Sequence, residues 1–136
     1  MAEPSFVTKD EQAAKIFDWA AGAAALRMAY YGLKLGLFQA IASEDGGLTP
    51  DDLVARTELD ARYVRAWART SVASELLEYD AASGRLTLAA FMEALLLDDA
   101  DFQYSAGLVT NFAVESRLAD RVGDCFTSGE GIPKLE

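Results

Sequence analysis

The sequence has no histidine and only one cysteine among its 136 residues. Without histidine, no side chain has an ordinary pKa near neutrality, which excludes histidine-ligated metals and histidine-activated nucleophiles, and with them most hydrolase mechanisms. The lone Cys125 excludes an internal disulfide framework and a multi-cysteine zinc site. We therefore predict no metal site and no catalytic residue in this chain, and we expect Cys125 to be a free, buried thiol in a reducing compartment.

Positive charge is also scarce, since 12 lysines and arginines face 22 acidic residues and the net charge is −10. A surface of this charge repels polyanions such as nucleic acid and anionic membranes. The sequence contains neither an apolar run of membrane-spanning length nor a signal peptide at its start. We expect a soluble, cytoplasmic protein with no membrane or nucleic-acid partner.

The two ends of the chain have the apolar periodicity of helices. Thr8, followed by acidic residues, is an expected N-cap for a helix that we predict to run to about Ala24. Residues 25–42 are apolar almost all round, which predicts a buried helix whose Gly32 and Gly36 allow close backbone approach or mark a break. A further helix is predicted from Asp101 to about Val122, with an apolar face that includes Phe102, Ala106, Val109, Phe112 and Ala113.

The middle of the chain predicts a winged helix-turn-helix. Thr49 and Pro50 are typical of a helix start, and Asp60 follows a short turn as the cap of a second helix. The segment "LLEYDAASGRLTL" alternates apolar and polar residues on both sides of a turn, as a β-hairpin does. We predict a mainly α fold, a winged helix-turn-helix with a small hairpin wing and flanking N- and C-terminal helices. Its expected parts are an N-terminal helical arm (1–24), the winged-helix domain (25–90) and a helical extension (91–136).

Three arginines on the second helix of this motif raise the question of DNA binding. Arg62, Arg65 and Arg69 fall at i, i+3 and i+7, on the side that would enter a major groove. Acidic residues outnumber the arginines of this module, however, and Arg85 is the only basic residue at the wing tip, where a DNA-binding wing normally carries several. The alternative is a solvated face whose arginines pair with nearby acids, for roughly a few tenths of a kcal/mol each. We favour this alternative.

Several segments together resemble a known family. The segment "LKLGLFQAIA", followed by "GGLTPDDLVARTELDARYVRAWARTSVASELLEYDAASGRLTL", resembles the N-terminal domain of class I S-adenosylmethionine-dependent methyltransferases of small molecules. "FMEALLLDD" resembles that family's short helix after the wing, and "CFTSGEGIP" resembles the glycine-rich segment that leads into its catalytic domain. The resemblance covers nearly the whole chain, and its specificity comes from the combination of segments.

The resemblance implies a winged helix that forms a homodimer and helps to close the substrate pocket of a neighbouring Rossmann-like domain. That family binds S-adenosylmethionine with a strand, a glycine-rich turn and a later acidic residue, and nothing in this sequence supplies them. We assign no cofactor-binding residue here and expect the cofactor in the full-length enzyme, whose catalytic domain is missing or separate. The chain is expected to be a fragment, a truncated form or a free-standing relative that transfers no methyl group alone.

A lid contributes to methyl transfer by positioning the small-molecule acceptor and excluding water. The candidate acceptor contacts are aromatic residues on the terminal helices: Phe17, Trp19, Tyr31 and Phe112. Core packing is the alternative role for each, and it is the one we favour.

Three hypotheses follow. The first is the dimerisation and substrate-lid domain of a methyltransferase. The second is a winged-helix transcription regulator that dimerises and inserts Arg62, Arg65 and Arg69 into DNA. The third is a stand-alone binder of aromatic small molecules in a cavity between the helical arms.

Overall fold

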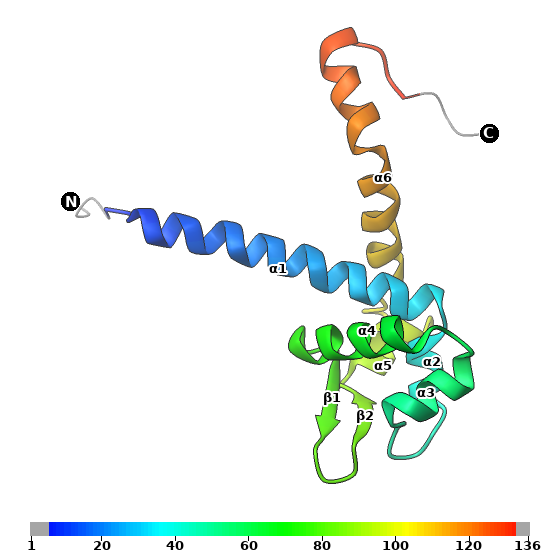
Figure 1. Cartoon of the computed structure of the whole chain (residues 1–136). Helices are drawn as coiled ribbons and strands as arrows, with labels where there is room; N and C mark the ends of the chain where they lie inside the picture. Colours follow the sequence, from blue (N-terminus) through cyan, green and yellow to red (C-terminus); the bar gives the residue numbers. More distant parts are fainter. Residues whose placement is uncertain (1–5, 133–136) are drawn as a thin grey trace.

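The structure is a computed structural model and describes residues 6–132. Two long helices, α1 and α6, project from a small winged-helix body and diverge from the point where they cross (Figure 1). The helices are α1 (Lys9–Lys34), α2 (Leu37–Ala42), α3 (Pro50–Thr57), α4 (Ala61–Ala73), α5 (Met92–Leu97) and α6 (Ala106–Ser128). The wing consists of β1 (Leu77–Asp80) and β2 (Arg85–Leu88). The predicted fold class, a mainly α winged helix-turn-helix, is confirmed.

The helix-turn-helix begins and turns at the residues that the sequence indicated. The Thr49 side chain accepts a hydrogen bond from the Asp52 amide (3.1 Å), and Pro50 takes the first position of α3. Helix α3 ends in a left-handed residue, Glu58. The Asp60 carboxylate then accepts from the Arg62 amide at 2.9 Å and starts α4. Because each cap satisfies amides that the first turn leaves free, the turn between α3 and α4 is fixed locally.

The wing is an antiparallel hairpin in which Leu77 pairs with Leu88 and Tyr79 with Leu86. Its turn is organised by Asp80, whose carboxylate accepts hydrogen bonds from the Ser83 hydroxyl and from the Ala82 and Ser83 amides. The Ser83 hydroxyl, followed by the Ala82 amide, holds the pKa of this carboxyl below its ordinary value. The predicted hairpin wing is confirmed.

The loop before α3 attaches to the wing through a close backbone approach. Leu48 pairs with Leu86 by two backbone hydrogen bonds. Gly47 precedes it with φ +76°, and a Cβ there would collide with the Leu86 carbonyl. Only glycine fits both the left-handed backbone and the contact.

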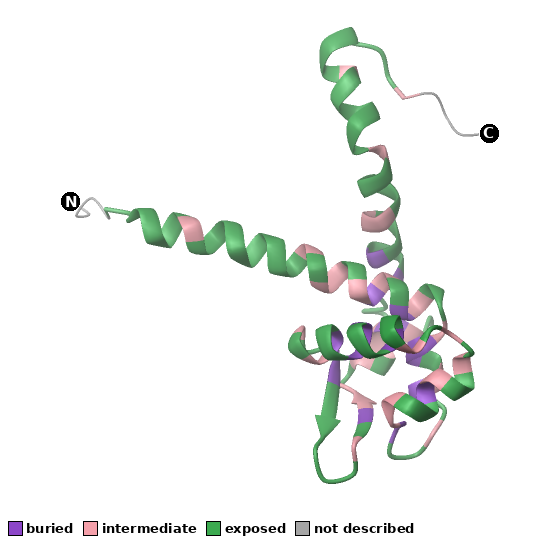
Figure 2. Ribbon diagram, viewed as in Figure 1, coloured by how far each residue is buried: buried purple, intermediate pink, exposed green. Residues whose placement is uncertain are grey.

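The core lies where α1, α2, α4 and the wing meet (Figure 2). Phe38 is fully buried, and its ring meets that of Trp67 edge to face at a centroid distance of 5.4 Å. The Trp67 indole N–H also donates to the Met28 carbonyl oxygen at 2.9 Å, which joins α4 directly to α1. Val64, Trp67 and Ala68 are buried along the inner face of α4, with Val72 half-buried beyond them.

The first helix does not end at Ala24, as the sequence pattern had predicted, but continues without interruption to Lys34. The alanine-rich stretch around residue 24 contains no helix breaker apart from Gly22, so the helix simply propagates. Gly36, with φ +70°, marks the break before α2. Gly32 instead allows close approach, because the Phe38 ring covers the place that a Cβ would occupy. The sequence left two roles open for these glycines, and the structure gives the close approach to Gly32 and the break to Gly36.

Helix α6 starts five residues later than predicted and runs beyond Val122 to Ser128. The carboxylates of Asp98 and Asp101 accept hydrogen bonds from the amides two residues on, and these turns compete with helix. Phe102, predicted on the apolar helix face, therefore lies in a turn outside the helix and is exposed. The prediction of a buried thiol is also wrong, because Cys125 is only half-buried on the projecting part of α6.

None of the helices in residues 6–132 is long and apolar enough to cross a membrane. Within the same range, no group of three or more cysteine, aspartate and glutamate side chains is placed to hold a metal ion.

Candidate functional site

The projecting parts of α1 and α6 are exposed (Figure 2), and they carry large apolar side chains of the kind that helices in globular proteins normally bury. On α1, Ile16, Phe17 and Trp19 are 63%, 74% and 70% exposed. On α6, the exposed apolar residues are Leu108, Val114, Val122 and Phe126. Several large apolar side chains exposed on projecting helices are typical of a contact with another protein surface or with a ligand.

The four predicted lid aromatics separate into two pairs. Phe17 and Trp19 stand on the projecting half of α1, and their exposure rules out core packing within this chain, which was the favoured alternative for them. Tyr31 and Phe112 come together where α1 and α6 cross, and both line a cavity of about 210 Å³. The Arg117 guanidinium donates to the Tyr30 hydroxyl at 2.8 Å beside this cavity and links the two helices.

A larger apolar cavity of about 580 Å³ lies between the end of α1 and the first half of α4. Tyr31, Leu35 and Tyr63 stand at its exposed edge, and the buried Trp67 lines its floor. Sequence reasoning missed Tyr63, which is 73% exposed, as a surface aromatic. Its position directly after Arg62, whose guanidinium lies over the Tyr63 ring, was the available signal.

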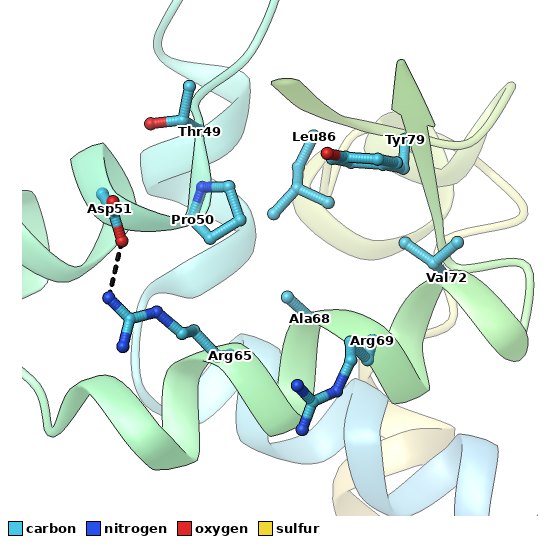
Figure 3. Close-up of a pocket in the computed structure, with 9 residues that line it drawn as sticks. All are labelled: Thr49, Pro50, Asp51, Arg65, Ala68, Arg69, Val72, Tyr79 and Leu86. Atoms are coloured by element: carbon cyan, nitrogen blue, oxygen red, sulfur yellow. Dashed lines mark hydrogen bonds and ion pairs between the residues drawn. The ribbon is translucent and has the colours of Figure 1, made fainter. Parts of the chain in front are cut away.

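The three arginines of α4 do not form a free cationic face. Arg65 makes an ion pair with Asp51 at 2.7 Å, and Arg62 lies 3.6 Å from the carboxylate of its own cap, Asp60. Arg69 accompanies Arg65 along the edge of a cleft between α3, α4 and the wing (Figure 3). This pairing is what the solvated-face interpretation predicts, whereas the role of the arginines towards DNA stays a prediction.

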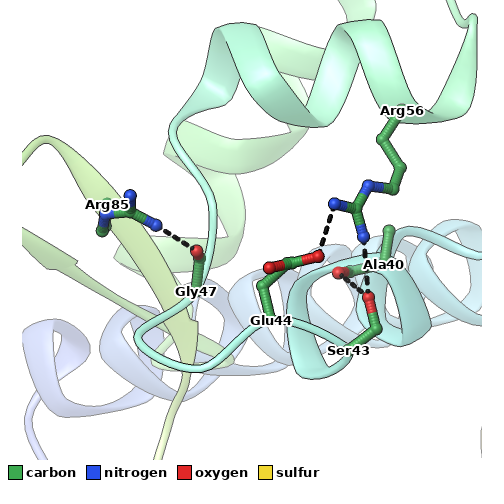
Figure 4. A network of polar contacts seen from close by, with 6 residues as sticks. All are labelled: Ala40, Ser43, Glu44, Gly47, Arg56 and Arg85. Carbon is green, nitrogen blue, oxygen red and sulfur yellow. Dashed lines mark hydrogen bonds and ion pairs between the residues drawn. The ribbon is translucent and has the colours of Figure 1, made fainter.

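Two further arginines, Arg56 and Arg85, join segments within the winged-helix body (Figure 4). Arg56 reaches from α3 to the Glu44 carboxylate (2.5 Å) and to the Ser43 hydroxyl (3.1 Å). Arg85, the basic residue of the wing, donates to the Gly47 carbonyl oxygen at 2.7 Å. Because these guanidinium groups already have partners, the wing presents little positive charge for phosphate.

The described residues do not fit S-adenosylmethionine. The strands found in residues 6–132 form one two-stranded antiparallel hairpin, whereas the family's cofactor site needs a parallel strand, a glycine-rich turn and a helix start. Gly129 caps the C-terminal end of α6 in a left-handed conformation, so it ends a helix instead of opening one.

Comparison with known proteins identifies the family. A model of the Rv2258c-like winged HTH domain matches residues 22–97, which is more than half of the chain. The chain belongs to the Rv2258c-like winged HTH domain family. The matched residues of this winged HTH domain contain the predicted winged-helix interval 25–90, while the division of the chain into three parts stays a prediction.

The fold of this winged HTH protein is also similar to part of a solved enzyme. The crystal structure of human N-acetylserotonin methyltransferase in complex with SAM superposes with a TM-score of 0.61 at 18% sequence identity. The match covers 98% of this chain and 41% of that enzyme, so the chain spans about two-fifths of its length. The search of curated protein sequences found no match. At this identity the likeness is one of fold, and it agrees with the family resemblance in the sequence.

Proposed function

We propose that this chain is the dimerisation and substrate-lid domain of an S-adenosylmethionine-dependent methyltransferase that acts on a small molecule. The observation that carries the proposal is the pair of projecting helices, α1 and α6, with apolar side chains exposed along them. The similarity to part of a methyltransferase structure supports it. In this proposal the winged helix is a scaffold, and its arginines have no nucleic-acid partner.

The projecting half of α1 is the surface that we assign to a second copy of the chain. A helix of this length without tertiary contacts is only marginally stable in water, and the exposure of Ile16 and Trp19 adds an unfavourable hydration term. Packing against the equivalent helix of a partner would remove both penalties. The same aromatics would then lie beside the partner's acceptor pocket, which is how one segment can serve both dimerisation and the lid.

In this proposal the chain positions the acceptor and excludes water, and none of its residues takes part in the chemical step. Methyl transfer needs the acceptor held in line with the sulfonium methyl group in a site closed to water. Tyr31 and Phe112 at the helix crossing, and Phe17 and Trp19 on the arm, supply apolar surface for such a closure. S-adenosylmethionine itself would be held by a Rossmann-like domain, attached or separate.

The test of dimerisation is sedimentation equilibrium of the chain and of two matched variants. Trp19→Asp places a charge next to Ile16 on α1, whereas Ala14→Asp places the same charge at an exposed position about 140° around the same helix from Trp19. Loss of a large aromatic anchor from an interface costs about 2 kcal/mol or more, and both copies of the dimer lose it, so the dissociation constant should rise by roughly 30-fold or more for Trp19→Asp. Ala14→Asp should leave it nearly unchanged.

Two results would contradict the proposal. A monomer at all micromolar concentrations would remove dimerisation, and equal weakening by both variants would place the interface elsewhere. Calorimetry with S-adenosylmethionine tests the assignment of the cofactor, since the chain alone should show no binding. Saturable binding by the chain alone would mean that no separate domain is needed to hold it.

A further inference from the structure

The face of α4 that carries the arginines borders a cleft that the proposed dimer and lid do not use. We call it the wing cleft, and it is lined by Pro50, Arg65, Ala68, Arg69, Val72, Tyr79 and Leu86, together with Thr49 and Asp51. Its volume is about 470 Å³, within the range of pockets that hold small organic molecules. It lies on the side of α4 opposite Trp67, which faces α1.

The interior of the wing cleft is apolar. Ala68 and Leu86 are buried at its floor, and Val72 is half-buried beside them. Figure 3 shows Pro50 and the ring of Tyr79 on either side of Leu86. A small aliphatic or aromatic group could cover these side chains and displace water from them.

The mouth of the wing cleft carries a net positive charge, from two arginines and one aspartate. Arg65 and Arg69 stand one helical turn apart, and Asp51 opposes them. Asp51 compensates Arg65, whereas the Arg69 side chain makes no hydrogen bond or ion pair with any of residues 6–132. The mouth therefore offers one uncompensated positive charge within a protein whose net charge is −10.

We propose that the wing cleft binds a small organic monoanion, an apolar or aromatic body that carries one carboxylate. The body would lie against Leu86, Val72 and the Tyr79 ring, and the carboxylate would accept hydrogen bonds from Arg69 at the mouth. The Arg69 guanidinium points away from Leu86 and Tyr79 (Figure 3), and because its side chain is exposed, it is free to turn towards the opening of the cleft. The Arg65 pair is exposed, with Asp51 79% accessible, so it can rearrange at small cost and add a second donor.

The charge at the mouth argues against larger anions. A polyphosphate or nucleic-acid backbone needs several free cations, whereas Asp51 would repel it and Arg85 is held by the Gly47 carbonyl. One free guanidinium matches one carboxylate. Because the cleft faces away from α1, this binding does not depend on whether the chain dimerises.

The test uses 4-phenylbutyrate as the probe and its neutral amide, 4-phenylbutyramide, as the control ligand. Titration of the isotope-labelled 136-residue chain, followed by amide NMR, should shift the signals of Ala68, Arg69, Val72 and Leu86. The acid should bind about tenfold more tightly than the amide, because the amide loses the charge-assisted hydrogen bond.

Two arginine variants separate the site from general electrostatics. Arg69→Gln should weaken 4-phenylbutyrate binding about tenfold, whereas Arg62→Gln changes the net charge equally on the same helix, outside the cleft, and should alter it by less than about twofold. The proposal is overturned if acid and amide bind alike, if both variants weaken binding equally, or if the shifted signals lie on α1 or α6. Absence of binding at millimolar probe would also overturn it, and displacement of the probe by a DNA duplex at physiological salt would assign the face to nucleic acid.

Discussion

Replacing Gly32 with alanine should destabilise this protein, although glycine-to-alanine changes inside helices usually do the reverse. Alanine is favoured over glycine by about 1 kcal/mol at an exposed helix position, because glycine loses more backbone freedom on folding. At Gly32, however, a Cβ would lie 2.6 Å from both Cδ2 and Cζ of the Phe38 ring. Ordinary carbon contacts are near 3.5–4.0 Å, so the ring would have to retreat by roughly an ångström.

The surrounding core leaves the ring little room to move, because Phe38 is fully buried and the Trp67 ring packs against it at a centroid distance of 5.4 Å. Overpacking of this kind costs about 1–3 kcal/mol, which outweighs the gain in helix propensity. Net of that gain, we expect Gly32→Ala to lower the free energy of unfolding by up to about 2 kcal/mol. Gly22→Ala is the matched control in the same helix, where a Cβ meets nothing within 4 Å, and it should stabilise by about 0.5–1 kcal/mol.

Urea denaturation followed by far-ultraviolet circular dichroism measures both variants, at one fixed protein concentration so that any association is compared at the same concentration. A third variant, Gly32→Ala combined with Phe38→Leu, tests the cause. If the clash is with the ring, the double variant should lose less stability than the sum of the losses of its two single variants, Gly32→Ala and Phe38→Leu. The reasoning is refuted if Gly32→Ala and Gly22→Ala stabilise the protein alike, or if the two changes at residues 32 and 38 are additive.

Three further predictions concern the turn residues and the arginines. Thr49→Ala removes the oxygen that accepts from the Asp52 amide and should lower the free energy of unfolding by about 1 kcal/mol in the same assay; no change would mean that Pro50 alone starts α3. The Asp80 pKa is held below 3.8 by the Ser83 hydroxyl and the Ala82 amide, so this carboxylate contributes stability above pH 3.8 and loses it as the pH falls through the lowered pKa. A carboxyl NMR titration of Asp80 should therefore give a midpoint below 3.8, and Ser83→Ala should raise it; a midpoint at or above 3.8 would contradict the turn geometry. Fluorescence anisotropy at physiological salt should show no binding of a random DNA duplex, whereas salt-sensitive binding that is lost on replacing Arg62, Arg65 and Arg69 by alanine would establish a regulator.

Much of the fold could be predicted because its determinants are local in the sequence. The caps at Thr8, Thr49 and Asp60 each use a side chain two or three residues from the amide that it accepts from, so the sequence alone reveals them. The hairpin follows from alternation on both sides of a short turn. The helix ends at Lys34 and Ala106 were harder, because an alanine-rich run gives no stop signal and aspartate turns compete with the start of α6.

The candidate site could be predicted only in part, since it depends on contacts between distant residues. The Arg65–Asp51 pair and the approach of Tyr31 to Phe112 join segments that no periodicity connects. Periodicity identifies an apolar face but does not say whether this chain covers it. Phe17 and Trp19 therefore read as core residues in the sequence and are exposed in the structure.

The hydrogen bond from Trp67 to the Met28 carbonyl oxygen anchors α1 to the winged-helix body near the C-terminal end of the helix. A change of tilt at this point is therefore amplified along the rest of α1. Twenty residues of α-helix extend about 30 Å, so tilting α1 at that point by roughly 5° would move its far end by about 2.5 Å. At Trp19, nine residues from Met28, the same tilt gives a displacement of about 1.2 Å, close to one carbon–carbon bond length, which a close-packed contact does not absorb. A conservative change beneath Trp67 could thus misalign a surface several helical turns away, and variants of the body should be examined for assembly as well as for stability.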